Sequence, residues 1–125
     1  MDRNEAIRAH TGWKKRLTAY LRHPDGSLDP SQVEQVNACQ LGEWIESEGR
    51  AEFSTDMAFQ HLEVAHSRFH LCAAEMMRRA DTDPCTFQTP DLHALDELSR
   101  ASREVVNSLL ALPVLVRPGR HLSRV

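Results

Sequence analysis

The sequence predicts an all-α protein that folds as an antiparallel four-helix bundle. Apolar residues recur at steps of three and four in four segments, which is the spacing of one face of an α-helix. Turn signals with short connections separate these segments, and no alternating strand pattern of useful length is present. The chain has 125 residues, of which 41% are apolar and 26% are charged, so it is long enough for one domain with a hydrophobic core. We predict that this domain covers residues 1–112.

The first two helices are predicted from their apolar faces and their ends. The first covers residues 3–22 and is ended by HPDG at 23–26. Its apolar face comprises Ala6, His10, Trp13, Leu17 and Tyr20. The second begins at Pro30, with Asp29 as the N-cap, and stops at Gly49, because glycine is common just after a helix end.

The third helix is predicted from Ser54 or Thr55 to Ala80, before the break at DTDPC. Its apolar stripe comprises Leu62, His66, Phe69, Ala73, Met76 and Ala80. The fourth has Thr89 as its cap and Pro90 at its first position, and it ends before Pro113. Its predicted apolar face comprises Leu92, Leu95, Ser99, Ser102, Val106 and Leu109. The basic tail 113–125 has two prolines and no helical period, so we expect it to be loose or to lie on a partner.

Charge is distributed unevenly along the chain, although the net charge is only −3. Residues 1–23 carry six Lys or Arg against two acidic residues, whereas residues 24–64 carry one Arg against nine. A basic first helix beside an acidic second one suggests that the two pack together or form a dimer contact. Binding to nucleic acid is not expected, because it would need a basic face on a basic domain.

The cellular compartment is predicted from what the chain lacks. No apolar run approaches the roughly 20 residues that span a bilayer, and the start MDRNEAIRAH has no apolar core of a secretory signal. The three cysteines are an odd number without CxxC spacing, which argues against a disulfide framework. We therefore expect a cytoplasmic protein with no membrane contact.

Four residues are candidate metal ligands. His66 and His70 are four positions apart in HSRFH, which places two imidazoles on one helix face. His10 lies on the apolar face of the first helix, and Cys39 lies in the second. Each has a structural alternative when it is taken singly. Such a histidine pair arises by chance, a histidine on an apolar face is more often a hydrogen-bonded core residue, and a lone cysteine is often an inert small hydrophobe.

The combination of the four favours one zinc ion per chain. Three imidazoles and one thiolate complete a tetrahedral set, and this mixture favours zinc over magnesium, calcium or manganese. Four protein ligands leave no open position for water, so we do not expect an enzyme. Glu63, three residues before His66, is a candidate to orient a ligand, although an ordinary surface glutamate is the commoner role.

Three motifs resemble a known family. HTGW at 10–13, CQLGEW at 39–44 and HSRFH at 66–70 stand in the order and at the spacings of the chemoreceptor zinc-binding (CZB) domain. The family pattern is H-x-x-W, then C-x-L-G-x-W, then H-x-x-x-H. The resemblance implies a zinc site with these ligands: His10, Cys39, His66 and His70. The supporting positions that it implies are Trp13, Leu41, Gly42 and Trp44.

The resemblance also implies a biological setting. Family members are bacterial cytoplasmic helical bundles, often dimeric, and usually stand beside a chemoreceptor signalling region or a diguanylate cyclase. This chain has no GGDEF-like segment and no long coiled-coil hairpin, so it looks like a stand-alone member that acts on such a partner in trans. A homodimer is also expected because apolar residues are spread widely round the second helix: Val33, Val36, Leu41, Trp44 and Ile45.

The favoured hypothesis is regulatory. Zinc level, or oxidation of Cys39 by an oxidant such as hypochlorous acid, would change the packing of the first two helices and hence a partner contact. Zinc as a structural staple of an interaction bundle, or a zinc buffer, is the alternative. A di-iron site of the ferritin type would need a second Glu-x-x-His motif besides the one at 63–66, and a haemerythrin-like carrier would need a second histidine cluster.

Gly42 is unusual because glycine inside a helix costs about 1 kcal/mol relative to alanine. It follows Cys39 by three residues, so both point to the same side of the predicted helix. We expect the missing side chain to let this helix approach its neighbours and bring the sulfur within reach of a metal held by the first and third helices. Leu41 and Trp44 would then keep water out.

Overall fold

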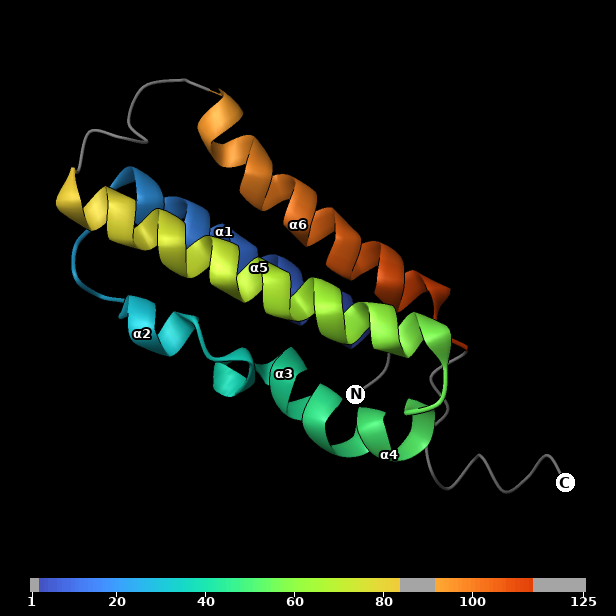
Figure 1. Ribbon diagram of the computed structural model, residues 1–125. Coiled ribbons are helices and arrows are strands. Elements are labelled where there is room, and N and C mark those ends of the chain that lie inside the picture. The colour runs from blue at the N-terminus through green and yellow to red at the C-terminus, as the bar shows by residue number, and fades with distance from the viewer. Residues whose placement is uncertain (1–2, 84–91, 114–125) are drawn as a thin grey trace, which may run out of the picture.

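The computed structural model describes residues 3–83 and 92–113, and every regular element in these two ranges is helical (Figure 1). Three helices are long: α1 (Arg3–Arg22), α5 (Met57–Thr82) and α6 (Leu92–Ala111). In Figure 1, α6 lies along one side of α5 and the segment from α2 to α4 lies along the other, with α1 behind. α5 contacts all of these parts, so it is the central helix of the bundle. The predicted all-α fold is confirmed.

The core forms where the long helices meet. All six residues of the stripe predicted on α5 are buried. On α1, Ala6, His10, Leu17 and Tyr20 are buried as predicted, while Trp13 is only partly buried. Full burial of a leucine or phenylalanine stabilises the fold by about 1.5–3 kcal/mol, so this row of side chains fixes how α5 is rotated.

The buried face of α6 differs from the prediction. It comprises Leu98, Ala101, Ser102, Val105 and Leu109, and Leu112 just after the helix is buried as well. Ser99 and Val106, which were predicted to face the core, are half-buried. The two faces are neighbours on the helix and share Ser102 and Leu109. The observed rotation buries the larger apolar side chains of Leu98 and Val105, and burial of apolar area decides between the two faces.

The prediction of one continuous helix from Pro30 to Gly49 is wrong, because the helix is interrupted twice in this segment. α2 (Pro30–Val33) ends early, and a 3₁₀ turn, η1 (Val36–Ala38), follows. A new helix, α3 (Gln40–Trp44), starts after Cys39. Cys39 has an extended backbone, with φ −120° and ψ 162°, which interrupts the helical hydrogen bonds. Asp29 caps α2 as predicted, since its carboxylate accepts from Ser31 N at 3.0 Å.

The predicted stop at Gly49 is also wrong. α3 continues through a π-helical stretch, η2 (Ile45–Gly49), into α4 (Arg50–Phe53). Gly49 has helical angles, φ −62° and ψ −48°. A Cβ there would lie 2.9 Å from ring carbons of both Trp44 and Phe59. The glycine therefore permits close packing of two aromatic rings and does not end the helix.

The remaining boundaries differ in detail. α5 starts at Met57, and its N-cap is Asp56, whose carboxylate accepts from Ala58 N and Phe59 N, so the start predicted near Ser54 or Thr55 was early. The predicted cap Thr89 and the residue Pro90 lie outside the described residues, as does the predicted loose tail beyond Pro113.

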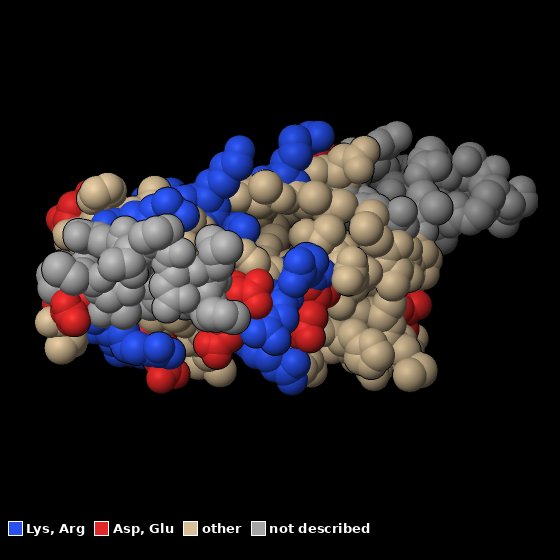
Figure 2. All heavy atoms as spheres, turned by 90° about the horizontal axis from the view of Figure 1, so that it is seen from above, with Lys and Arg blue, Asp and Glu red and all other residues tan. Residues whose placement is uncertain are grey.

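The surface mixes charges of both signs. Figure 2 shows basic and acidic side chains interspersed on one face of the molecule. Within residues 3–83 and 92–113, three surface ion pairs join α5 to neighbouring segments: Arg50–Glu63 at 2.9 Å, Arg68–Glu104 at 3.4 Å and Arg78–Glu34 at 2.6 Å. Exposed pairs of this kind contribute at most about 1 kcal/mol each. No helix among the described residues has the length and apolar character to cross a membrane.

Candidate metal centre

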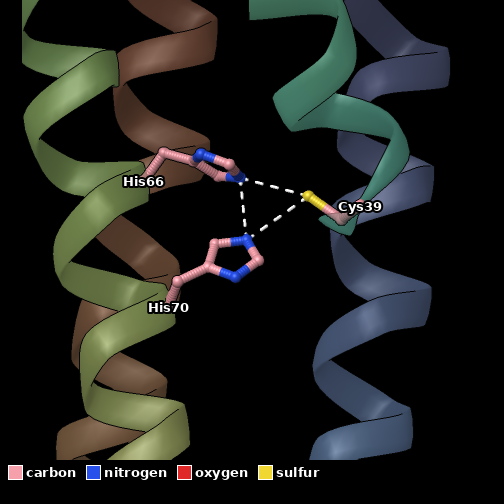
Figure 3. Close-up of side chains that lie close together, drawn as sticks. All are labelled: Cys39, His66 and His70. Carbon is pink, nitrogen blue, oxygen red and sulfur yellow. Dashed lines mark hydrogen bonds between the residues drawn. The ribbon is translucent and has the colours of Figure 1, made fainter. Parts of the chain in front are cut away.

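Three of the four candidate ligands meet at one point. His66 and His70 extend from adjacent turns of α5 toward Cys39, which stands at the start of α3 (Figure 3). The Cys39 Sγ lies 3.2 Å from His66 Nε2 and 3.4 Å from His70 Nε2. The two Nε2 atoms are 3.1 Å apart. Both histidines are buried, and Cys39 is partly buried.

These separations fit a tetrahedral zinc site. Ideal bond lengths and angles place two ligand nitrogens about 3.3 Å apart and a nitrogen about 3.6 Å from a sulfur. Each observed separation is shorter by no more than about 0.4 Å. All three donor atoms lie within 4.8 Å of one another. They therefore form one face of the tetrahedron that zinc requires, and a fourth position is left for one more ligand.

The His70 ring is oriented by the backbone of α2. Its Nδ1 lies 2.6 Å from the carbonyl oxygen of Val33. A carbonyl only accepts, so Nδ1 carries the proton and the lone pair of Nε2 is free to bind a metal. Such a partner on the other nitrogen fixes the tautomer and the direction of a ligating histidine. The carbonyl that orients His70 therefore belongs to the last residue of α2.

Cys39 is held as the N-cap of α3. The Gly42 N–H donates to its Sγ at 3.3 Å. The sequence predicted a cysteine inside a helix beside a glycine that allows neighbouring helices to approach. The structure corrects this: a Cβ on Gly42 would lie 1.7 Å from the carbonyl oxygen of Val36 and 2.7 Å from its carbon. The close approach is to the preceding turn of the same segment, and it puts the sulfur at a helix start.

His10 is buried beside the three-residue cluster but uses one nitrogen elsewhere. Its ring packs edge-on against Phe69, with ring centroids 4.6 Å apart. Its Nε2 lies 2.8 Å from Ser102 Oγ on α6. Neither of its ring nitrogens lies within 4.8 Å of all three donor atoms of the cluster. The role of His10 as the fourth ligand stays a prediction.

The other residues predicted to support the centre differ in burial and in their contacts. Leu41 and Trp44 are buried on α3. Trp13 packs against the core, and its Nε1 is buried without a hydrogen-bond partner in the described part of the chain. Glu63 forms an ion pair with Arg50 at 2.9 Å, which is the ordinary surface role for a glutamate.

Burial keeps the imidazoles of the centre neutral. It lowers the pKa of His66 from 6.5 to about 3, with smaller contributions from the charges of His70 and His10. It lowers the pKa of His10 to about 4, again assisted by His70. The pKa of His70 is also lowered by burial, against the hydrogen bond to Val33, which raises it. At neutral pH these side chains offer lone pairs to a metal without first losing a proton.

Zinc binding near pH 7 is therefore expected to release about one proton per chain. Burial raises the pKa of the Cys39 thiol above its ordinary value of 9.0, so the metal-free sulfur is protonated and must lose its proton to bind. The histidines add little to this number, because burial lowers the pKa of each of them, to about 4 for His10 and about 3 for His66. Calorimetric titration with zinc in buffers of different ionisation enthalpy measures the number. Release of two or more protons would mean that an imidazole is charged in the metal-free protein.

Two partners of the candidate histidines were not predicted: Val33, whose carbonyl contacts His70, and Ser102, whose hydroxyl contacts His10. The Val33 carbonyl is a backbone group, and no residue type in the sequence signals its use. Ser102 was placed on the apolar face of α6 without a role. A buried hydroxyl is costly unless it is hydrogen-bonded, so a serine amid that apolar face was the available signal.

Comparison with protein families gives a match that covers most of the site-bearing part of the chain. The model of the chemoreceptor zinc-binding domain matches residues 10–77, which is more than half of the chain and includes all four candidate ligands. Comparison with curated proteins and with solved structures gives no match.

Proposed function

The chain belongs to the chemoreceptor zinc-binding domain family, and from this premise we propose that it is a zinc-binding regulatory domain switched by zinc level or by the state of Cys39. The observation that carries the proposal is the meeting of Cys39 Sγ with two imidazole nitrogens at tetrahedral separations. The single oxidisable ligand stands at the start of a helix, so a chemical change at the sulfur acts directly on the backbone.

The proposed site holds one zinc ion per chain. Cys39, His66 and His70 supply three donors, and His10 on α1 supplies the fourth. Zinc bound by four protein ligands stabilises the arrangement of these side chains and has no open position for a substrate. The proposed role is therefore not catalytic.

Cys39 couples the site to α3. Its sulfur is both a donor to the metal and the N-cap that accepts from Gly42 N. Hypochlorous acid can convert the thiol to sulfenic acid: the sulfur loses two electrons and gains the oxygen, and chloride and a proton leave. The partly buried sulfur is reachable by so small an oxidant. The change weakens the metal site and the cap together, and so alters how α3 packs on α1.

The proposed output is a contact with a cytoplasmic bacterial signalling protein, such as a chemoreceptor or a diguanylate cyclase. We include a homodimer in the proposal. Met57, Val64 and Leu71 support it, because they are 71%, 55% and 55% exposed and recur every seven residues along α5. A stripe with this spacing stays on one side of a helix and can meet its own copy across a two-fold axis.

Treatment with hypochlorite is expected to release zinc within a few equivalents per chain. The reason is that oxidation removes the only thiolate from the ligand set. Released zinc is followed with a chromogenic chelator. A Cys72→Ala/Cys85→Ala double variant, in which Cys39 is the only thiol, should release zinc as the parent does.

Two results would count against the proposal. If the parent retained its zinc through many equivalents of hypochlorite, the redox switch would be rejected. If chelation of zinc unfolded the protein in far-ultraviolet circular dichroism, zinc would be a structural staple. The apolar core around α5 supports the opposite expectation, that the metal-free protein stays helical, since its buried side chains make their contacts without a metal.

A further inference from the structure

The buried polar side chains among the described residues are His10, His66, His70 and Ser102. They form two contacting pairs, His66 with His70 and His10 with Ser102. Three of these are candidate metal ligands, and Ser102 is the exception. It lies on α6, outside the residues 10–77 that match the family.

Ser102 is joined to the site through His10. The distance from Ser102 Oγ to His10 Nε2 is 2.8 Å, and the two residues are 8% and 2% exposed. The neighbours of Ser102 on the same buried face are apolar, so its hydroxyl depends on this partner to offset the cost of leaving water. The contact therefore joins α6 to α1 at a candidate metal ligand.

The chemistry of a neutral imidazole determines what this contact does. One ring nitrogen carries a proton and the other carries a lone pair. His70 already shows the arrangement that suits a ligand, with Nδ1–H donating to Val33 O and Nε2 facing the other two donor atoms of the cluster. In His10 it is Nε2 that has the partner. Its remaining nitrogen, Nδ1, is then the one left for a metal.

We propose that Ser102 is a positioning residue of the metal centre, which accepts from His10 Nε2–H and so presents Nδ1 of His10 as the fourth metal-binding atom. This inference rests on the four-ligand site proposed above. On this proposal a bound metal fixes the position of His10 on α1, and the hydrogen bond to Ser102 then fixes the position of α6. The position of α6 along α1 therefore depends on metal binding.

The direct test is nuclear magnetic resonance of the full chain labelled with ¹⁵N-histidine and loaded with ¹¹³Cd in place of zinc. Scalar coupling to ¹¹³Cd identifies each ligating nitrogen. The expected result is coupling to Nε2 of His66 and of His70 and to Nδ1 of His10. In the metal-free protein, the His10 ring should be the Nε2–H tautomer.

Variants give a second measurement. Ser102→Ala is expected to lower zinc affinity by about 10–100-fold, the usual effect of losing the partner of a ligating histidine. Ser102→Thr keeps the hydroxyl and should restore most of the affinity. Ser99→Ala, one turn earlier on α6 and half-buried, is the matched control and should bind zinc as the parent does.

The outcomes separate this inference from the function on which it rests. Coupling at His66 and His70, with His10 coupled through Nε2 or not at all, would overturn the role of Ser102 and leave the zinc site of the other residues standing. Parent-like zinc affinity in Ser102→Ala would overturn it too. Absence of coupling at His66 and His70 would overturn the proposed site and this inference with it.

Discussion

Replacing Cys39 with alanine is expected to lower the zinc affinity of the protein by about 10²–10³-fold. Structural zinc sites have apparent binding free energies of roughly 10–16 kcal/mol, so each of four ligands accounts for about 2.5–4 kcal/mol. Every 1.4 kcal/mol is about tenfold in affinity. Cys39 supplies the thiolate of the cluster, and its Sγ lies within 3.4 Å of both imidazole nitrogens. Competition with a chelator of known affinity measures the loss.

Cys72→Ala is the matched control for this experiment. Cys72 is also a free and partly buried cysteine, but it lies on α5 with its sulfur 3.6 Å from that of Met76. Its replacement should leave zinc affinity within a factor of about three of the parent. If Cys39→Ala bound zinc as tightly as Cys72→Ala, the metal would have to be held without the thiolate, and the proposed switch would have no chemical basis.

The parts of the site that were predicted from sequence are those set by local periodicity. His66 and His70 share a face of α5 because four residues make about one turn of a helix. That face is buried because Leu62 and Phe69 lie on it. Both conditions depend only on residues 62–70, and the structure confirms that His66 and His70 lie on the buried side of α5.

The break before α3 was not predicted, because it depends on contacts between residues that are not adjacent. Propensity does not locate a break at Cys39, because Gly42 is the weakest helix former of this stretch. In the folded chain, the turn at Val36–Ala38 lies against Gly42, and Cys39 becomes a cap in place of an interior residue. The glycine was identified as unusual from the sequence, but its neighbour could be identified only from the structure.

The orientation of the histidines is the other feature that sequence could not predict. Val33 orients His70 through a carbonyl that every residue type has. Ser102 is 92 residues from His10 along the chain. Helical periodicity places a ring on a face, but it does not say which nitrogen carries the proton. That depends on partners contributed by other helices.

Gly42→Ala is expected to destabilise the metal-free protein by about 3 kcal/mol, at the upper end of the usual cost of overpacking. The new Cβ would lie 1.7 Å from the Val36 carbonyl oxygen, and a backbone group cannot rotate away as a side chain can. Either η1 or the start of α3 must move. Cys39 stands between them, so zinc affinity should fall as well. Denaturant unfolding of the metal-free protein and a separate zinc titration measure the two effects.

Gly12→Ala is the control, and its expected effect on stability is opposite to that of Gly42→Ala. Gly12 lies in α1, is exposed, and has nothing within 4 Å of an added Cβ. Replacing a helical glycine by alanine at such a place should stabilise the protein by up to about 1 kcal/mol and leave zinc affinity unchanged. The same substitution thus strengthens one helix and disrupts another, because only Gly42 has a backbone carbonyl pressed against it. Equal stabilisation of both variants would show that the Val36 turn does not lie against α3, and the placement of Cys39 as its N-cap would then be wrong.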